Sequence, residues 1–305
     1  MPSPLRVLVI GADGTIGSAL SQNLLDLGHN VFQTTRRKLA NPSAYSIFLD
    51  LAEPVVETDR LPDVDVAIVC AAMARFADCR TRPDLARQVN VISTSSLARQ
   101  LTNRGTFVVR LSSSAVFDCL SPHALADQQT APRSIYGRLQ ADAEAALLGF
   151  GSSSAVLRLT KILTPQSSLF KDWVCHLLQG RSIEAFTDHT LCPLPLAAAV
   201  NAVTTVLLSR QGGIFQISGS RDISYANLAR HLARRLNVPV ARVTPVRAVE
   251  RGIPENEVTP FTSMDTTRLT ALTGFIRPEP LAVMDDVLDE LLAKANYQKA
   301  KMKQS

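Results

Sequence analysis

A short apolar run, residues 7–10, leads directly into three closely spaced glycines, Gly11, Gly14 and Gly17, and a helical pattern follows over residues 16–27. Glycine allows a tight turn after a strand and lets the following helix pack closely on that strand. Free N–H groups at the helix N-terminus then attract phosphate. The pattern predicts a strand, turn and helix that bind the pyrophosphate of a dinucleotide, and the same turn contains Asp13, Thr15 and Ile16.

Strand-like and helical segments alternate through the first half of the chain. Strands are expected at residues 30–35, 46–50, 64–70, 106–111 and 155–159, and helices at residues 83–102 and 134–148. Parallel strands are joined by right-handed crossovers, usually through a helix. We therefore expect an α/β Rossmann fold, a doubly wound parallel sheet, that binds NAD(P) within residues 1–165.

A second region begins after residue 165, where prolines interrupt shorter segments. Helices are expected at residues 169–179, 224–236 and 281–295, and Ser224 is a favourable N-cap. The β-branched segment 213–218 is expected to return to the sheet as a strand. Residues 166–295 thus form a smaller C-terminal region that binds substrate, and residues 296–305 a basic tail that we expect to be disordered.

Composition argues against several classes of protein. The net charge of +5 comes mostly from dispersed arginines and a lysine-rich tail, so we expect no nucleic-acid partner. No apolar stretch approaches the roughly 20 residues of a membrane helix, and residues 1–10 lack a secretory pattern. The five cysteines and five histidines lack metal-ligand spacing. We expect a cytoplasmic protein with no metal and no membrane partner.

The end of the second predicted strand bears on the choice of cofactor. NAD-binding proteins usually place an acid there, which binds the ribose 2′-hydroxyl. This chain has Arg36 and Arg37 instead, and an arginine fork suits a 2′-phosphate. NADP(H) is therefore expected rather than NAD(H), the alternative being a basic loop that lies in solvent. Residues after the third and fourth strands are also expected to lie beside the cofactor: Asp50, Leu51, Cys70, Ala71 and Ala72.

The fifth predicted strand runs into Leu111-Ser112-Ser113-Ser114, and Tyr136-Gly137 follow on the next helix. With the glycine turn, Ala71-Ala72, Asn90-Val91 and Leu157-Arg158, these residues make the chain resemble the extended branch of the short-chain dehydrogenase/reductase superfamily. Within it, the likeness is to dTDP-4-dehydrorhamnose reductases and epimerase-type nucleotide-sugar enzymes. The resemblance implies that Ser113 hydrogen-bonds the substrate carbonyl, that Tyr136 donates a proton, and that Asn90 and Leu111 lie beside the cofactor.

The chain departs from this family at two positions. The family has lysine four residues after the tyrosine, where it hydrogen-bonds the nicotinamide ribose and lowers the tyrosine pKa. Here that residue is Gln140, which supplies the hydrogen bond but no charge. Ala198 replaces an acid that usually follows the proline-containing stretch. The resemblance also implies a set of residues that contact the substrate: Ser113, Ser114, Tyr136, Lys161, Phe170, Trp173 and Pro193.

The leading hypothesis is an NADP(H)-dependent reductase acting on a keto group of a nucleotide-linked deoxysugar or similar small molecule, with an active site weakened by Gln140. Ser114-Ala115 stand where dehydratases of this branch have acids, which disfavours dehydration. Two alternatives stay open. One is an epimerase of the same branch, and the other is a non-catalytic regulatory protein that binds a dinucleotide or sugar nucleotide. The resemblance also suggests a homodimer.

Overall fold

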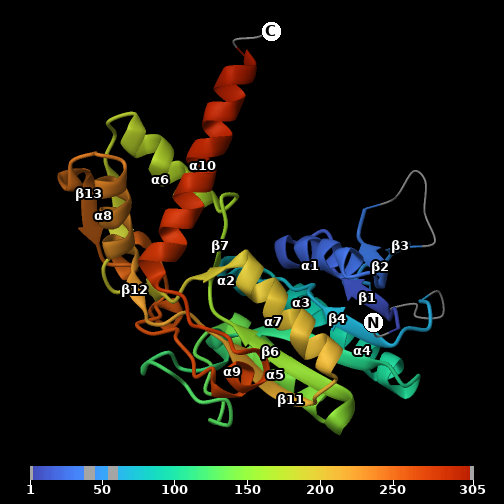
Figure 1. The fold of residues 1–305 in the computed structure, drawn as a ribbon. Helices are drawn as coiled ribbons and strands as arrows, with labels where there is room; N and C mark the ends of the chain where they lie inside the picture. The colour runs from blue at the N-terminus through green and yellow to red at the C-terminus, as the bar shows by residue number, and fades with distance from the viewer. Residues whose placement is uncertain (1–2, 38–44, 54–60, 303–305) are drawn as a thin grey trace.

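The computed structural model describes residues 3–37, 45–53 and 61–302, with side chains as far as Lys294. Its centre is a seven-stranded sheet in the order β11-β6-β5-β4-β1-β2-β3, in which every neighbouring pair is parallel (Figure 1). The strands are β1 (Arg6–Ile10), β2 (Asn30–Thr35), β3 (Ser46–Phe48), β4 (Val66–Val69), β5 (Phe107–Ser113), β6 (Ser154–Leu159) and β11 (Gly213–Ile217). This confirms the doubly wound Rossmann fold. The segment expected to return to the sheet is β11, which pairs with β6.

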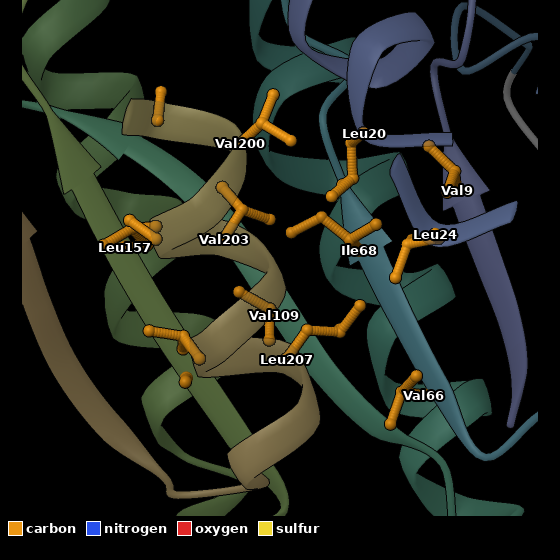
Figure 2. Packing of buried hydrophobic residues seen from close by; sticks show 14 of the residues in the cluster. Val9, Leu20, Leu24, Val66, Ile68, Val109, Leu157, Val200, Val203 and Leu207 are labelled. Atoms are coloured by element: carbon orange, nitrogen blue, oxygen red, sulfur yellow. The ribbon is translucent and has the colours of Figure 1, made fainter. Parts of the chain in front are cut away.

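Helices cover both faces of this sheet because its strands are apolar on both sides. Along β1, Val7 and Val9 face one helical layer, and Leu8 and Ile10 face the other. On the first face, α1 (Thr15–Asp26) packs on β1, and α7 (Leu196–Ser209) packs on β4, β5 and β6 (Figure 2). On the second, α4 (Thr94–Asn103) and α5 (Ile135–Leu148) cover the sheet.

Several helical segments differ from the sequence-based expectation. The single helix expected at residues 83–102 is instead α3 (Pro83–Arg87), a π-helical turn η1 (Gln88–Ser93) and α4, and the short α2 (Phe76–Thr81) precedes them. Pro83 starts α3 because its fixed φ suits the first helical position. Helix α7 was not expected from the sequence, although it covers β4, β5 and β6 on the first face of the sheet.

The C-terminal region has a second hydrophobic core, separate from the sheet. It contains α6 (Ser168–Leu178), α8 (Tyr225–Arg235), α10 (Pro280–Met302) and a parallel pair, β8 (Ile183–Phe186) with β13 (Val243–Val246). Two further short pairs, β7 (Ile162–Leu163) with β10 (Leu194–Pro195) and β9 (Thr190–Leu191) with β12 (Ile223–Ser224), stand beside it. The short helix α9 (Thr267–Thr273) packs back on β11 and α7. The last helix continues to Met302, into the residues expected to form a disordered tail. None of the helices in the described part of the chain is both long and apolar enough to cross a membrane.

A buried ion pair ties α5 to the sheet. Arg158 on β6 donates to both carboxylate oxygens of Glu144, the shorter contact being 2.7 Å, and both side chains are almost completely buried. The same guanidinium donates to the carbonyl of Ala126 and to Oε1 of Gln216 on β11. Burial makes a one-sided loss of such a pair costly, so this network fixes α5 relative to β6 and β11.

Candidate active site

The glycine turn lies where the order of the sheet reverses, between the carboxyl ends of β1 and β4. Gly11 has a φ of +86°, and a Cβ added to it would lie 2.8 Å from Ala71, the second residue after β4. A Cβ at Gly17 would lie 2.3 Å from the carbonyl oxygen of Gly11. Both positions therefore require glycine, and both bring backbone close to the place where a cofactor would cross the sheet.

The N-terminus of α1 is open to an anion. Gly14 is its N-cap and offers no side-chain hydrogen bond, and the first turn contains no acid. A cavity of about 620 Å³ opens over this turn. It is lined by Ala12, Asp13, Gly14, Thr15, Ser18, Gln33 and residues from the C-terminal region. Unpaired N–H groups beside an open cavity fit the pyrophosphate of a dinucleotide.

The end of β2 presents two positive charges and one negative charge. Arg36 and Arg37 are both exposed directly after the strand. Thr35 donates a 2.6 Å hydrogen bond from its hydroxyl to Oδ2 of Asp13, which brings the carboxylate of the glycine turn to the same place. The arginines suit a ribose 2′-phosphate, whereas Asp13 suits a free 2′-hydroxyl.

The other residues expected beside the cofactor have mixed environments. Asp50 accepts a hydrogen bond from the backbone of Ala52, so its carboxylate stabilises a turn, and Leu51 is buried. Cys70 and Ala71 both donate backbone hydrogen bonds to the carbonyl of Ile10, which fastens the end of β4 to β1. Ala72 is exposed.

Asn90 holds the segment that follows β4. Its amide oxygen accepts from the backbone N–H of Met73 at 2.7 Å, and its amide nitrogen donates to the carbonyl of the same residue at 2.9 Å. Asn90 is completely buried within the π-helical turn. Such single-turn bulges re-aim backbone groups inside a helix, and here the carbonyl of Asn90 is available to a neighbour on the sheet.

Ser113, Tyr136 and Gln140 meet at the carboxyl end of β5. Tyr136 and Gln140 are four residues apart on α5, and both are buried on the face that packs against the sheet. The Ser113 hydroxyl and the Gln140 amide both act on the Tyr136 phenol, and both lower its pKa. Ser113 ends the strand and accepts from the backbone of Ala115 at 3.2 Å, and the following Ser114 is buried. The structure therefore brings Ser113 and Tyr136, whose hydroxyls are expected to act on a carbonyl, to the same end of β5.

The residue that sequence reasoning missed is Arg110, in the middle of β5. It is 2 % exposed, and its Nη2 donates to the carbonyl of Asn90 at 2.9 Å and to Oε1 of Gln140 at 3.1 Å. Burial lowers the pKa of Arg110 to about 10, so the side chain is still charged at neutral pH. An arginine inside an apolar strand was the available signal, because a buried charge needs polar partners.

Burial also decides the ionisation of Tyr136. It raises the pKa of the phenol above its usual value near 10, although the Ser113 hydroxyl, the charge of Arg110 and the Gln140 amide all act in the opposite direction. Tyr136 is therefore protonated at neutral pH. The site can donate a proton to an oxygen that gains negative charge.

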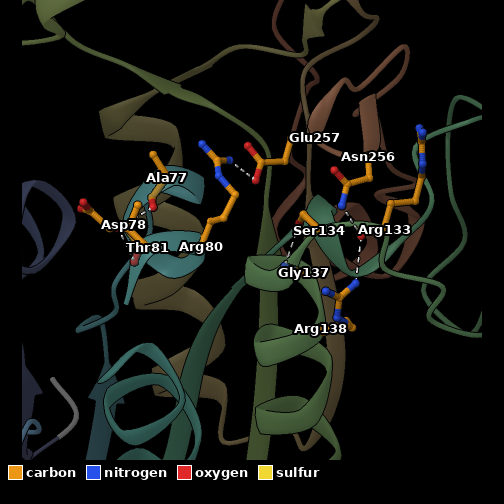
Figure 3. A network of polar contacts seen from close by, with 10 residues as sticks. All are labelled: Ala77, Asp78, Arg80, Thr81, Arg133, Ser134, Gly137, Arg138, Asn256 and Glu257. Atoms are coloured by element: carbon orange, nitrogen blue, oxygen red, sulfur yellow. Dashed lines mark hydrogen bonds and ion pairs between the residues drawn. The ribbon is translucent and has the colours of Figure 1, made fainter. Parts of the chain in front are cut away.

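The start of α5 is pressed against the end of β5. A Cβ at Gly137 would lie 2.0 Å from the carbonyl oxygen of Ala115. Ser134 caps the helix by accepting from the backbone N–H of Gly137 at 3.0 Å (Figure 3). Arg138 points away from the site and donates to the carbonyl of Arg133. Close packing at Gly137 thus places Tyr136 against Ser113.

The C-terminal region is tied to the same place by residues 255–258 (Figure 3). Asn256 donates to the carbonyl of Arg133, and Arg133 donates to the carbonyls of Glu255 and Val258. Glu257, which is buried, pairs with Arg80 on α2 at 2.5 Å. These contacts fasten one segment of the C-terminal region to both α2 and the start of α5.

The remaining residues expected to contact the substrate lie farther into the C-terminal region. Lys161 is exposed just after β6. Phe170 and Trp173 are 2 % and 5 % exposed and pack edge to face in the second core, so they offer little surface to a substrate. Pro193 is buried, with its carbonyl against Gly219. No group of three potential metal ligands occurs among the described residues.

Comparison with known proteins gives the family context. A family model described as the RmlD substrate binding domain matches residues 5–293. Methionine adenosyltransferase 2 subunit beta of Xenopus laevis is 27% identical over 255 residues, covering 79% of this chain and 75% of that protein. The dTDP-4-dehydrorhamnose reductase of Sinorhizobium fredii is 25% identical over 243 residues, covering 75% of this chain and 77% of that protein.

Solved structures share the fold at lower identity. A dTDP-4-dehydrorhamnose reductase of Bacillus anthracis in complex with NADP has a TM-score of 0.80 and 18% identity, covering 94% of this chain and 100% of that one. The protein MoeE5 in complex with UDP-glucose and NAD has a TM-score of 0.78 and 21% identity, covering 94% and 99%. Both dinucleotides thus occur in proteins of this fold.

Proposed function

Because this chain belongs to the RmlD substrate binding domain family, we propose that it is an NADP(H)-dependent reductase that acts on a keto group of a nucleotide-linked deoxysugar or a similar small molecule. The observation that carries the proposal is that Tyr136, buried on α5, lies beside Ser113 at the carboxyl end of β5. Both lie at the edge of the sheet where the glycine turn offers a dinucleotide site.

A nicotinamide cofactor would supply hydride to the carbonyl carbon. The backbone of the glycine turn and the N-terminus of α1 would hold its pyrophosphate. Asn90 and the backbone hydrogen bonds of Cys70 and Ala71 keep the rim of that site rigid. Gln140, beside Tyr136, would lie near the nicotinamide ribose.

The protein's own residues manage the oxygen of the substrate. Ser113 orients a carbonyl by donating a hydrogen bond, and Tyr136 delivers the proton that the developing alkoxide needs. The raised pKa of Tyr136 keeps this proton in place at neutral pH. A buried, protonated phenol favours reduction over oxidation, because oxidation of an alcohol needs the ionised form of the same residue.

NADP(H) is favoured over NAD(H) by Arg36 and Arg37, and the carboxylate of Asp13 opposes that preference. The Arg36→Ala/Arg37→Ala double variant should lose roughly 10- to 100-fold in affinity for NADPH, because it loses two charged donors to the 2′-phosphate, and should bind NADH unchanged. Titration of both cofactors by calorimetry measures this. Arg87→Ala, an exposed arginine on α3, is the matched control.

The reductase itself is tested by NADPH oxidation with a panel of nucleotide-linked keto sugars. Wild type should turn over at least one of them, and Tyr136→Phe should lose at least about 100-fold in kcat while it still binds NADPH. Cofactor binding without any hydride transfer would contradict the proposal. Co-purified NAD that recycles with substrate would indicate an epimerase instead.

A second candidate is a non-catalytic subunit. It is favoured by the similarity to a protein named as a subunit of another enzyme and by Gln140 in place of the family's lysine. Its signature is dinucleotide binding with no turnover.

We also propose a homodimer through α4 and α5, which sedimentation velocity tests.

A further inference from the structure

Arg110 is a cation inside the sheet without a matching anion. No described carboxylate lies within ion-pair distance of its guanidinium, and its Nε is buried without a hydrogen-bond partner. Its two described contacts are the carbonyl of Asn90 and Oε1 of Gln140. A buried charge is costly unless neighbouring polar or charged groups stabilise it. The position of Arg110 inside the sheet therefore calls for a physical explanation.

The contact with Gln140 fixes which way the amide faces. Because Oε1 accepts from Arg110 at 3.1 Å, the amide NH₂ is the group of Gln140 left to donate toward Tyr136, which lies one helical turn away on the same buried face of α5. A donor directed at the phenolic oxygen stabilises that oxygen when it gains negative charge. Arg110, Gln140 and Tyr136 therefore form a polarised chain from β5 to the proton donor.

Other charged groups around this chain do not replace Arg110. Tyr136 is faced by Cys79 from α2 and by Ser113 from β5. Burial raises the pKa of Cys79, so that thiol is neutral at pH 7. Glu144, the charge on α5 that acts on Arg110, is already paired with Arg158. Arg110 is the source of positive field at Tyr136 among the described residues.

We propose that Arg110 is a positioning residue that orients Gln140 and supplies from β5 the positive charge beside Tyr136, a charge that α5 does not carry in this chain. The inference rests on the proposed reductase function. It implies that the site keeps both contributions of the family's lysine but divides them between two residues. Arg110 on β5 supplies the positive charge, and Gln140 on α5 supplies the hydrogen-bonding group.

The direct test is to titrate Tyr136 and to monitor its ionisation by NMR, using protein labelled with ¹³Cζ-tyrosine. The Tyr136→Phe variant identifies the resonance of Tyr136. Arg110→Met should move the ionisation of Tyr136 to higher pH, because the phenolate loses its neighbouring cation. Arg110→Lys should keep it near the wild-type value. Arg87→Met should leave the titration unchanged. An unchanged Tyr136 titration in folded Arg110→Met would overturn the proposal.

A second pair of variants covers the case in which Arg110→Met does not fold. The double variant Arg110→Met/Gln140→Lys moves the cation to α5 and should fold and restore the wild-type titration. Gln140→Lys alone places two cations together beneath α5 and should lower the melting temperature. If Gln140→Lys is as stable as wild type, or if the double variant does not recover the wild-type titration of Tyr136, then a cation at residue 140 does not substitute for Arg110 and the proposal is contradicted.

Turnover separates this inference from the proposed function. If wild type reduces a keto sugar, Arg110→Met should lower kcat roughly 10- to 100-fold with little change in KM, and Arg110→Lys should recover most of that loss. If wild type shows the NMR behaviour but no turnover, the charge arrangement stands and the reductase proposal fails. If turnover is unaffected by Arg110→Met, the positioning role fails and the reductase stands.

Discussion

At the scale of single residues, the least replaceable position near the reacting groups is a glycine. Gly137→Ala would drive a methyl group against the carbonyl oxygen of Ala115, a contact of 2.0 Å before any shift. We expect the free energy of unfolding to fall by about 1–3 kcal/mol. We also expect kcat to fall, and by more than this loss of stability would explain, because relief of the overlap moves Tyr136. Urea unfolding and kcat measure the two effects.

Gly149→Ala at the end of the same helix provides the control. Its Cβ would meet the carbonyl of Ala146 at 3.4 Å, and its φ of −60° suits alanine. This variant should be neutral or more stable by up to about 1 kcal/mol. Equal behaviour of the two variants would contradict the packing argument.

The pH dependence of reduction follows from the state of Tyr136. A proton donor must be protonated, and burial raises the pKa of Tyr136 above its usual value near 10. The kcat for reduction should therefore be level from pH 6 to 9 and fall only as pH rises beyond about 10. Stopped-flow NADPH oxidation across this range measures it. A kcat that halves between pH 6 and 8 would point to a different donor.

Sequence reasoning reached some of these residues and not others. Gly11 and Gly17 directly follow a strand, so order along the chain was enough to propose them, whereas Ser113 and Tyr136 were proposed from the resemblance to a known family. Arg110 was invisible to that reasoning because its role depends on which helix lies over β5. Only the packing of α5 brings it to Gln140.

At the scale of elements, α5 is held by its buried ion pair as well as by apolar contacts. Glu144→Gln would leave the Arg158 charge uncompensated in the core, and we expect a loss of about 3–5 kcal/mol in the free energy of unfolding. Glu290→Gln, which breaks an exposed pair with Lys294 on α10, should change it by less than about 0.5 kcal/mol. Chemical denaturation of both variants compares them. Similar losses would show that burial of the pair is not the deciding factor.

Elements whose ends are marked by turn or cap residues were predicted better than elements without such signals. The bounds of β2 matched and those of α1 and α5 fell within a residue. The glycine turn marks the start of α1, and Ser134 caps the start of α5. By contrast, α7 is apolar on nearly every side, so it shows no stripe, and it starts directly after Pro195 without a side-chain cap. The π-helical turn at Gln88–Ser93 interrupts the expected helix, and the sequence did not indicate it because it depends on the hydrogen bonds between Asn90 and Met73.

At the scale of the whole molecule, the two regions are interleaved along the chain. The chain leaves the sheet after β6, returns in α7 and β11, leaves again for α8, and returns in α9. A fragment of residues 1–165 lacks α7 and β11, so it exposes the apolar face of β4, β5 and β6. It should show no cooperative thermal transition by circular dichroism, and co-expression with residues 166–305 should restore one. A sharp transition in the fragment alone would contradict this dependence.

The same interleaving has a consequence during synthesis on the ribosome. After β6 ends at Leu159, another 50 residues must be translated before α7 is complete at Ser209. At roughly 5–20 residues per second this takes about 3 to 10 seconds. For that time the nascent chain presents Val66, Ile68, Val109 and Leu157 without their covering helix. Translation speed across residues 160–209 should therefore affect how much of this protein escapes aggregation.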